Sequence, residues 1–222
     1  MIEPDDREVN KWNWRKAIGI FLNVVIVILT AVGLYIMFKG KEPGAGLSSS
    51  GFENFKYFTV LSNVFSGIVA ALWLILFMLN RKLHVLPKLI SASAVGLTFL
   101  MVAAFLAPAY PNLNLYTGGN LYFHLIVPLF AMVEFILYEV DGKIPFKYTL
   151  YAMIPSFVYG IGYLINILIN GVGEWPNSND WYGFLNWGYP VGFCIFAAAL
   201  LMIWGMACIL RILNYLFNKL IK

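Results

Sequence analysis

The stretch AIGIFLNVVIVILTAVGLYIMF, residues 17–38, decides the fold because none of its side chains is charged. At a rise of about 1.5 Å per residue, a helix of this length crosses the roughly 30 Å hydrocarbon core of a bilayer. A helix also satisfies its own backbone hydrogen bonds, as lipid requires. The stretch therefore predicts a transmembrane helix.

Five further runs share this length and apolar character, roughly at residues 55–79, 89–107, 121–138, 146–170 and 189–213. We therefore predict an all-α, polytopic membrane protein with six transmembrane helices. The runs divide the chain into a cytoplasmic N-terminal segment 1–16, a single transmembrane domain 17–213 and a cytoplasmic tail 214–222.

The composition excludes several classes of protein. Of 222 residues, 61% are hydrophobic and 12% are charged, and the mean hydropathy is +0.77. A soluble domain is about half apolar and about a quarter charged. A water-soluble enzyme, a disordered chain and a nucleic-acid-binding protein are therefore excluded. Without zinc-type spacing or a Gly-rich phosphate loop, we expect neither a metal nor a cofactor.

Positive charge predicts the orientation, because cytoplasmic loops carry an excess of Lys and Arg. Twelve basic residues flank one side of the predicted spans and three flank the other. The twelve are Arg7, Lys11, Arg15, Lys16, Arg81, Lys82, Lys88, Lys143, Lys147, Arg211, Lys219 and Lys222, and the three are Lys39, Lys41 and Lys56. We therefore expect both termini in the cytoplasm.

The predicted outer loops are aromatic and carry little charge. Residues 171–188 include Trp175, Trp181, Tyr182 and Trp187. These rings fit an aromatic belt at the headgroup level, or a lid over a cavity that admits lipid. The loop 40–51 is expected to be flexible because it is rich in Gly, Ser and Pro.

A polar stripe follows the second span. Thr59, Ser62, Asn63 and Ser66 have the spacing of one helical face. Such a stripe could hold neighbouring helices together at about 0.6 kcal/mol per contact, or could form a site.

The fourth span contains His124, the only histidine within any predicted span, and Pro128 four residues later. Proline has no N–H, so the helix should kink and leave the carbonyl of His124 without its donor. His124 is either a packing histidine or a functional base.

Thr59 and His124 each lie about four residues inside the outer end of their spans, which is about 6 Å below it. The two spans run in the same direction. We therefore expect a hydroxyl and a titratable base in one layer of the outer half of the membrane.

A further polar stripe follows the fifth span, and either lines the same cavity or pairs with neighbours. Its members are Ser156, Tyr159, Tyr163, Asn166 and Asn170. Glu134 lies about 15 Å deeper than His124. It is expected to be protonated, paired with a Tyr or Asn, or part of a polar cluster on the cytoplasmic side.

The segments YFTVLSN at 57–63 and HLIVPLF at 124–130 resemble the Pr6Pr-type bacterial membrane proteins. More distantly they resemble the androgen-induced and androgen-dependent TFPI-regulating membrane proteins (FAR-17a-like). The resemblance implies six spans, residence in a bacterial cell membrane and hydrolysis of fatty acid esters of hydroxy fatty acids. It makes Thr59 and His124 the catalytic pair.

The chemistry is physically reasonable, because a threonine hydroxyl becomes a nucleophile when a base takes its proton. Ser62 and Asn63 are candidate oxyanion donors, and a backbone carbonyl or an Asn is expected to orient His124. The other candidate substrate-binding residues are Ser66, Tyr163, Asn166 and Asn170.

The leading hypothesis is therefore a threonine-type hydrolase whose partner is a lipid with an acyl chain. A small transporter or lipid-binding protein would use the same polar stripes without catalysis. A structural or signalling protein would pack His124 without a neighbouring pocket. The sequence leaves the oligomeric state undetermined.

Overall fold

The computed structural model of the protein describes residues 6–39, 51–109, 111–140, 142–174 and 178–221, and side chains from Trp14 onward. Most of the predicted flexible loop, residues 40–50, lies outside the described residues, as do Trp175 and the side chains of Arg7 and Lys11. The described residues are predominantly helical and contain no strand.

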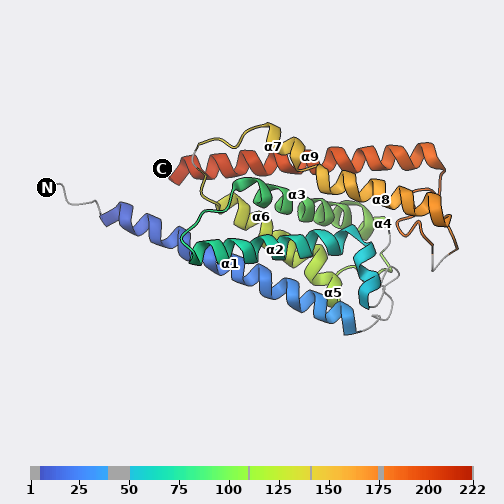
Figure 1. The fold of residues 1–222 in the computed structure, drawn as a ribbon, viewed down its shortest axis with the longest axis horizontal. Helices are drawn as coiled ribbons and strands as arrows, with labels where there is room; N and C mark the ends of the chain where they lie inside the picture. The colour runs from blue at the N-terminus through green and yellow to red at the C-terminus, as the bar shows by residue number, and fades with distance from the viewer. Residues whose placement is uncertain (1–5, 40–50, 110, 141, 175–177, 222) are drawn as a thin grey trace.

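Within the described residues, six helical segments are long and apolar enough to cross a membrane, which confirms the predicted fold class. Successive segments run in opposite directions, so the start of the first and the end of the last lie at the same end of the bundle (Figure 1). Their bounds are Trp14–Lys39, Phe58–Met78, Val85–Leu106, Gly118–Leu137, Lys147–Asn170 and Tyr189–Ile221.

The first, second and last segments are the continuous helices α1 (Asp6–Lys39), α2 (Phe58–Met78) and α9 (Tyr189–Ile221). A short 3₁₀ helix, η1 (Gly51–Lys56), precedes α2. Helix α9 continues well past the predicted end of the sixth span, so residues 214–221 extend the helix rather than form a separate tail.

The third and fourth segments each contain one π-helical turn. The third consists of α3 (Val85–Met101), η2 (Val102–Leu106) and α4 (Ala107–Ala109), and the fourth consists of α5 (Gly118–Leu121), η3 (Tyr122–Ile126) and α6 (Val127–Leu137). The fifth is divided into α7 (Lys147–Tyr151) and α8 (Ile154–Asn170). The π-turn η3 carries His124, and such turns are frequent at functional sites.

Small residues allow the helices to approach closely around η3. A Cβ atom added to Gly33 of α1 would lie 2.6 Å from the Phe123 ring, and one on Gly67 of α2 would lie 2.9 Å from Thr30. Packing of this kind is typical of membrane helices, where small residues let backbones come together. It fixes α1, α2 and the fourth segment as one packed unit.

The last turns of α9 hold the C-terminal end of α6. Asn214 donates to the carbonyls of Phe135 and Tyr138 at 2.9 and 2.8 Å, and Asn218 donates to Tyr138 at 3.1 Å. These carbonyls belong to the end of a helix, where four acceptors lack partners in the helix. Contacts about 80 positions apart in the chain therefore close the bundle at this end.

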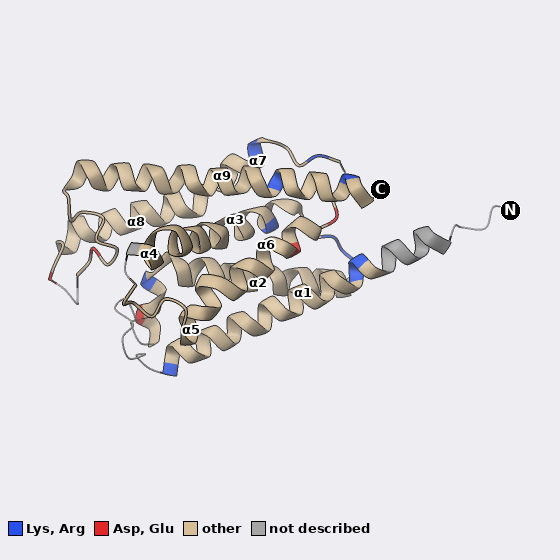
Figure 2. Ribbon diagram, turned by 180° about the vertical axis from the view of Figure 1, so that it is seen from behind, with Lys and Arg blue, Asp and Glu red and all other residues tan. Residues whose placement is uncertain are grey.

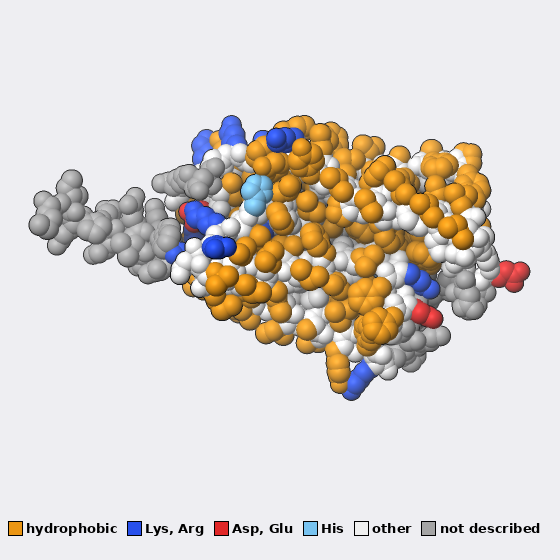
Figure 3. All heavy atoms as spheres, viewed as in Figure 1, with side chains coloured by type: hydrophobic (Ala, Val, Ile, Leu, Met, Phe, Trp, Pro, Cys, Tyr) orange, Lys and Arg blue, Asp and Glu red, His pale blue; other side chains and the backbone are white. Residues whose placement is uncertain are grey.

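The surface has the distribution of a membrane protein. Apolar side chains cover the long side of the bundle in Figure 3, and Lys and Arg gather mainly at the end that holds both termini (Figure 2). The observed arrangement agrees with the charge bias of the sequence, and the cytoplasmic location of this end stays a prediction.

Candidate functional site

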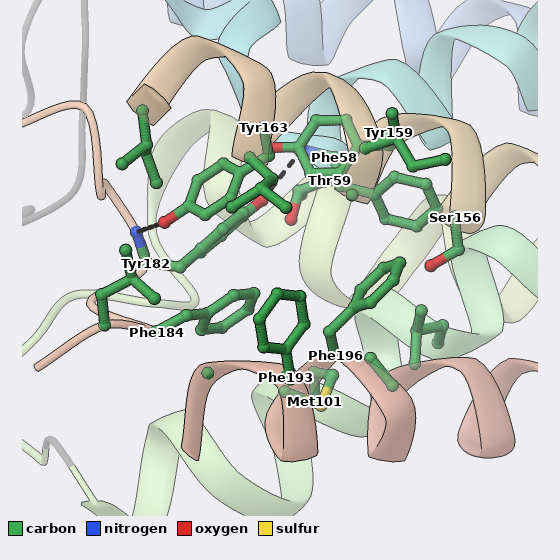
Figure 4. A pocket seen from close by; sticks show the side chains of 18 of the residues that line it. Phe58, Thr59, Met101, Ser156, Tyr159, Tyr163, Tyr182, Phe184, Phe193 and Phe196 are labelled. Atoms are coloured by element: carbon green, nitrogen blue, oxygen red, sulfur yellow. Dashed lines mark hydrogen bonds between the residues drawn. The ribbon is translucent and has the colours of Figure 1, made fainter. Parts of the chain in front are cut away.

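A cavity of about 280 Å³ lies between α2, α3, α8 and α9 (Figure 4). Most of its wall is apolar, including Phe58, Met101, Phe193 and Phe196. Ligand sites are typically concave and mostly apolar, with a few polar groups that orient the ligand. The cavity therefore has the character of a site for an apolar ligand such as an acyl chain.

The cavity occupies the end of the bundle opposite the termini. On α8 its lining begins at Ser156 and on α9 it ends at Ala199. Below these positions the bundle is filled by a buried apolar cluster that includes Leu89, Phe135 and Ala207. The cavity is consequently closed toward the end that we predict to be cytoplasmic.

One side of the cavity reaches the apolar surface. Ile161 of α8 and Phe193 of α9 both line it, and they are 41% and 54% exposed. Helix α8 itself is loosely held, since only Ser156, Tyr163 and Ile167 of its 17 residues are buried. The cavity therefore meets the apolar surface at the boundary between α8 and α9.

The loop between α8 and α9 lies over the cavity, and Asp180 organises it. This buried carboxylate accepts hydrogen bonds from the Tyr163 hydroxyl and from the backbone N–H groups of Phe184 and Leu185. Phe184 and Leu185 line the cavity. Residues 178–188, which we call the lid, therefore form part of the cavity wall, and this arrangement is compatible with the lid interpretation of the sequence.

Tyr182 fastens the lid to the start of α2. Its hydroxyl accepts a hydrogen bond from the backbone N–H of Phe58 at 2.9 Å, and its backbone N–H donates to the Tyr163 hydroxyl at 3.3 Å. Burial raises the pKa of the Tyr182 hydroxyl well above its usual value, so the ring is held neutral. Phe58 directly precedes Thr59, so the lid also positions the catalytic candidate.

Thr59 lines the cavity beneath the lid. Figure 4 shows its side chain among the rings of Phe58, Tyr159 and Tyr182. Its hydroxyl has no hydrogen-bond partner in the part of the chain that the structure describes. A free hydroxyl in an apolar wall is available to a bound ligand.

The remaining members of the α2 stripe face neighbouring helices. Ser62 pairs with Thr98 of α3, with 3.2 Å between the hydroxyl oxygens. Asn63 donates to the carbonyls of Thr59 and Phe123 at 2.8 and 2.9 Å. Both amide hydrogens of Asn63 are used, so the oxyanion role predicted for it does not fit this arrangement. Ser66 is buried outside the cavity lining.

His124 is buried in η3, and a backbone carbonyl orients it. The distance from Nδ1 to the carbonyl oxygen of Leu115 is 2.6 Å. Because a carbonyl only accepts, Nδ1 carries a proton, and in the neutral imidazole Nε2 therefore has the lone pair. A backbone carbonyl therefore takes the orienting role, as one of the predicted alternatives proposed. Among the described residues, none makes a hydrogen bond to Nε2.

Thr59 and His124 belong to neighbouring elements, because the amide of Asn63 joins the Thr59 carbonyl to that of Phe123. The shared layer predicted from the sequence is consistent with this link. However, His124 is not among the residues that line the cavity. The structure thus places the Thr59 hydroxyl in the cavity wall and the His124 imidazole outside the cavity lining.

The polar stripe of the fifth span has two different roles. Tyr163 lines the cavity, whereas Asn166 and Asn170 are absent from its lining. Asn166 donates to Asn179 at 3.4 Å, and Asn179 donates to the Gly171 carbonyl at 2.8 Å. These amides hold the base of the lid, so Asn166 and Asn170 are not placed to contact a substrate in the cavity.

A buried polar cluster joins the first turns of α3 to the last turns of α6. Lys88 Nζ is 2.6 Å from both Glu134 Oε1 and Asn23 Oδ1, and Asn23 donates to Glu134 at 2.9 Å. The prediction that Lys88 belongs to a cytoplasmic turn is wrong, because its side chain is 3% exposed and packs within the bundle. The basic neighbours Arg81 and Lys82 suggested that Lys88 belongs to the same turn. The sequence does not reveal its burial because its partner, Glu134, is far away along the chain.

In the described ranges, no group of three His, Cys, Asp or Glu side chains could hold a metal ion. No protein-family model, curated protein or solved structure matches the chain.

Proposed function

We propose that this protein is an intramembrane hydrolase of lipid esters, with Thr59 as the nucleophile and His124 as the base. The observation that carries the proposal is the free hydroxyl of Thr59 in the wall of an apolar, lidded cavity. The resemblance of residues 57–63 and 124–130 to Pr6Pr-type bacterial membrane proteins supports it and suggests a bacterial cell membrane as its location.

The reaction would proceed in two balanced steps. Thr59 Oγ1 attacks the ester carbonyl while His124 Nε2 takes its proton, and the proton passes to the departing alcohol. Water then attacks the acyl-threonine while the imidazole takes a proton from it, and the imidazolium returns that proton to Thr59 Oγ1 as the fatty acid is released. The Leu115 carbonyl stabilises the tautomer that this role requires.

The proton transfer requires Nε2 within about 3.2 Å of the Thr59 hydroxyl, or one water between them. Catalytic hydrogen bonds often tighten only when substrate is bound. The proposal therefore includes an approach of the imidazole to the cavity wall when an acyl chain fills the cavity.

The substrate would enter from the bilayer between α8 and α9. Ile161 and Phe193 connect the cavity to the lipid-facing surface, and the packed cluster around Phe135 closes the opposite end. A transporter needs access from both sides of the membrane, whereas a hydrolase of membrane lipids does not. Closure at one end favours the hydrolase over the transporter.

The decisive experiment is labelling with a fluorophosphonate probe in purified protein, followed by mass mapping of the modified residue. We expect the label on Thr59, and loss of both labelling and lipid-ester hydrolysis in Thr59→Ala and His124→Ala. Ser93→Ala and His84→Asn serve as matched controls, since Ser93 lies outside the cavity lining and His84 caps the start of α3. Full activity in both Thr59 and His124 variants would falsify the assignment.

A lipid-binding protein without catalysis is the second candidate, because His124 is absent from the cavity lining. It would bind a fluorescent fatty acid saturably and displaceably without labelling at Thr59. Bulky substitution at Phe193 or Ala199 would abolish binding in either case. Only labelling and hydrolysis distinguish the two functions.

A further inference from the structure

The π-turn η3 creates a carbonyl that no backbone group of its own helix can satisfy. In this turn the N–H of Val127 donates to the carbonyl of Tyr122, five positions earlier. The same register would pair the Phe123 carbonyl with residue 128, which is a proline and has no N–H. The sequence pattern alone pointed to the carbonyl of His124, and the π register moves the missing bond by one residue.

Asn63 supplies the missing donor from α2. Its side-chain nitrogen lies 2.9 Å from the Phe123 oxygen, and the residue is completely buried. The same nitrogen donates to the Thr59 carbonyl at 2.8 Å. One amide group therefore connects the backbone of the proposed nucleophile to the residue next to the proposed base.

The two donated hydrogen bonds explain why residue 63 is an asparagine. Its Oδ1 atom is buried without a hydrogen-bond partner among the described residues. An unpaired buried acceptor lowers the stability of the fold. A leucine of similar size would avoid this cost, so packing alone does not account for Asn63.

We propose that Asn63 is a positioning residue, which replaces the N–H that Pro128 lacks and so fixes the register between Thr59 and His124. Its catalytic consequence rests on the proposed hydrolase function. Asn63 lies outside the cavity lining, so it acts through the backbone of its neighbours and does not contact the substrate.

The structural part is tested without any activity, by thermal unfolding of purified protein in detergent. Asn63→Leu should lower the melting temperature because the Phe123 carbonyl is left buried and unpaired. Pro128→Ala returns an N–H to the chain, so the same substitution should cost less than half as much in the Pro128→Ala background. Ser62→Ala, whose hydroxyl bonds to Thr98, is the control and should have the same effect in both backgrounds. Equal losses for Asn63→Leu in both backgrounds would overturn the proposal.

The catalytic part is tested by the kinetics of fluorophosphonate labelling at Thr59. For Asn63→Leu we expect the labelling rate at saturating probe to fall by about tenfold or more, because small displacements of reacting groups are costly. The probe concentration for half-maximal rate should change by less than about twofold, since the cavity wall is intact. A change confined to that concentration, or none at all, contradicts a positioning role. If the wild-type protein is not labelled, the proposed function fails with this catalytic part, while the unfolding experiment still decides the structural link.

Discussion

Lys88 and Glu134 form an ion pair that is almost completely removed from solvent, with side-chain exposures of 3% and 5%. The Lys88 ammonium also lies over the rings of Trp73 and Tyr138, at 5.3 and 5.6 Å from their centroids. Charged groups inside a membrane protein are costly unless they are paired. Asn23 completes the cluster, which therefore connects α1, α3 and α6.

Removing one member of this pair should be much worse than removing both charges. We expect Lys88→Met to lower the free energy of unfolding by about 3–5 kcal/mol, because the Glu134 carboxylate is left buried and unpaired. Lys88→Met combined with Glu134→Leu should recover most of this loss. Denaturant unfolding measures the stability of both variants, with Arg81→Met as an exposed control expected to stay within about 0.5 kcal/mol of wild type. A double variant as unstable as the single one would show that the ion pair is not what holds these helices.

Helix α8 is held by few buried residues and contributes more residues to the cavity lining than any other helix that the structure describes. It touches α9 through Gly160, where an added Cβ would lie 2.0 Å from the Phe196 ring. Phe196 itself lines the cavity. The glycine is therefore needed for close approach, and a larger residue must move either the ring or the helix.

Gly160→Ala should lower both thermal stability and binding of a fluorescent fatty acid, since Phe196 would be displaced. Gly162, two residues away, has open space around its Cβ position and provides a matched control. Gly162→Ala should be neutral or stabilising by up to about 1 kcal/mol, because alanine favours helix more than glycine. Melting curves and a fluorescence titration compare the two variants, and indistinguishable results would contradict the packing argument.

The elements differ in how far their sequence determines them. Apolar runs predicted the spans to within a few residues, because hydrocarbon thickness fixes their length, except that the sixth continues as helix to Ile221. The π-turn at His124 was foreseen only as a kink at Pro128, since its register depends on Asn63 from another helix. Thr59, which the sequence singles out by its place in a polar stripe, lines the cavity, whereas the role of Asp180 required knowing where the lid folds.

For the whole molecule, the asymmetry of charge makes the orientation testable. The exposed Arg81 lies at the end that holds both termini, and the exposed Glu174 lies in the loop at the opposite end. The positive-inside rule places Arg81 in the cytoplasm. The lid, the cavity and Thr59 would then belong to the outer half of the bilayer.

This orientation is checked by cysteine labelling in intact cells, after Cys194 and Cys208 have been replaced by Ala. Glu174→Cys should react with a membrane-impermeant maleimide from outside, and Arg81→Cys should react only after the cells are permeabilised. The reverse pattern would invert the topology and move the proposed site to the inner half.

The Lys88–Glu134 pair also constrains how the chain enters the membrane. The two residues are 46 positions apart, so the ribosome delivers the third span well before the carboxylate of the fourth. A lone lysine costs about 2.5–3.5 kcal/mol at the centre of an inserting helix. Lys88 lies near the start of its helix, so its ammonium group can stay in the aqueous phase until its partner arrives. The third and fourth spans should consequently leave the translocon as a hairpin, with neutralisation of the charge completing their partition into lipid.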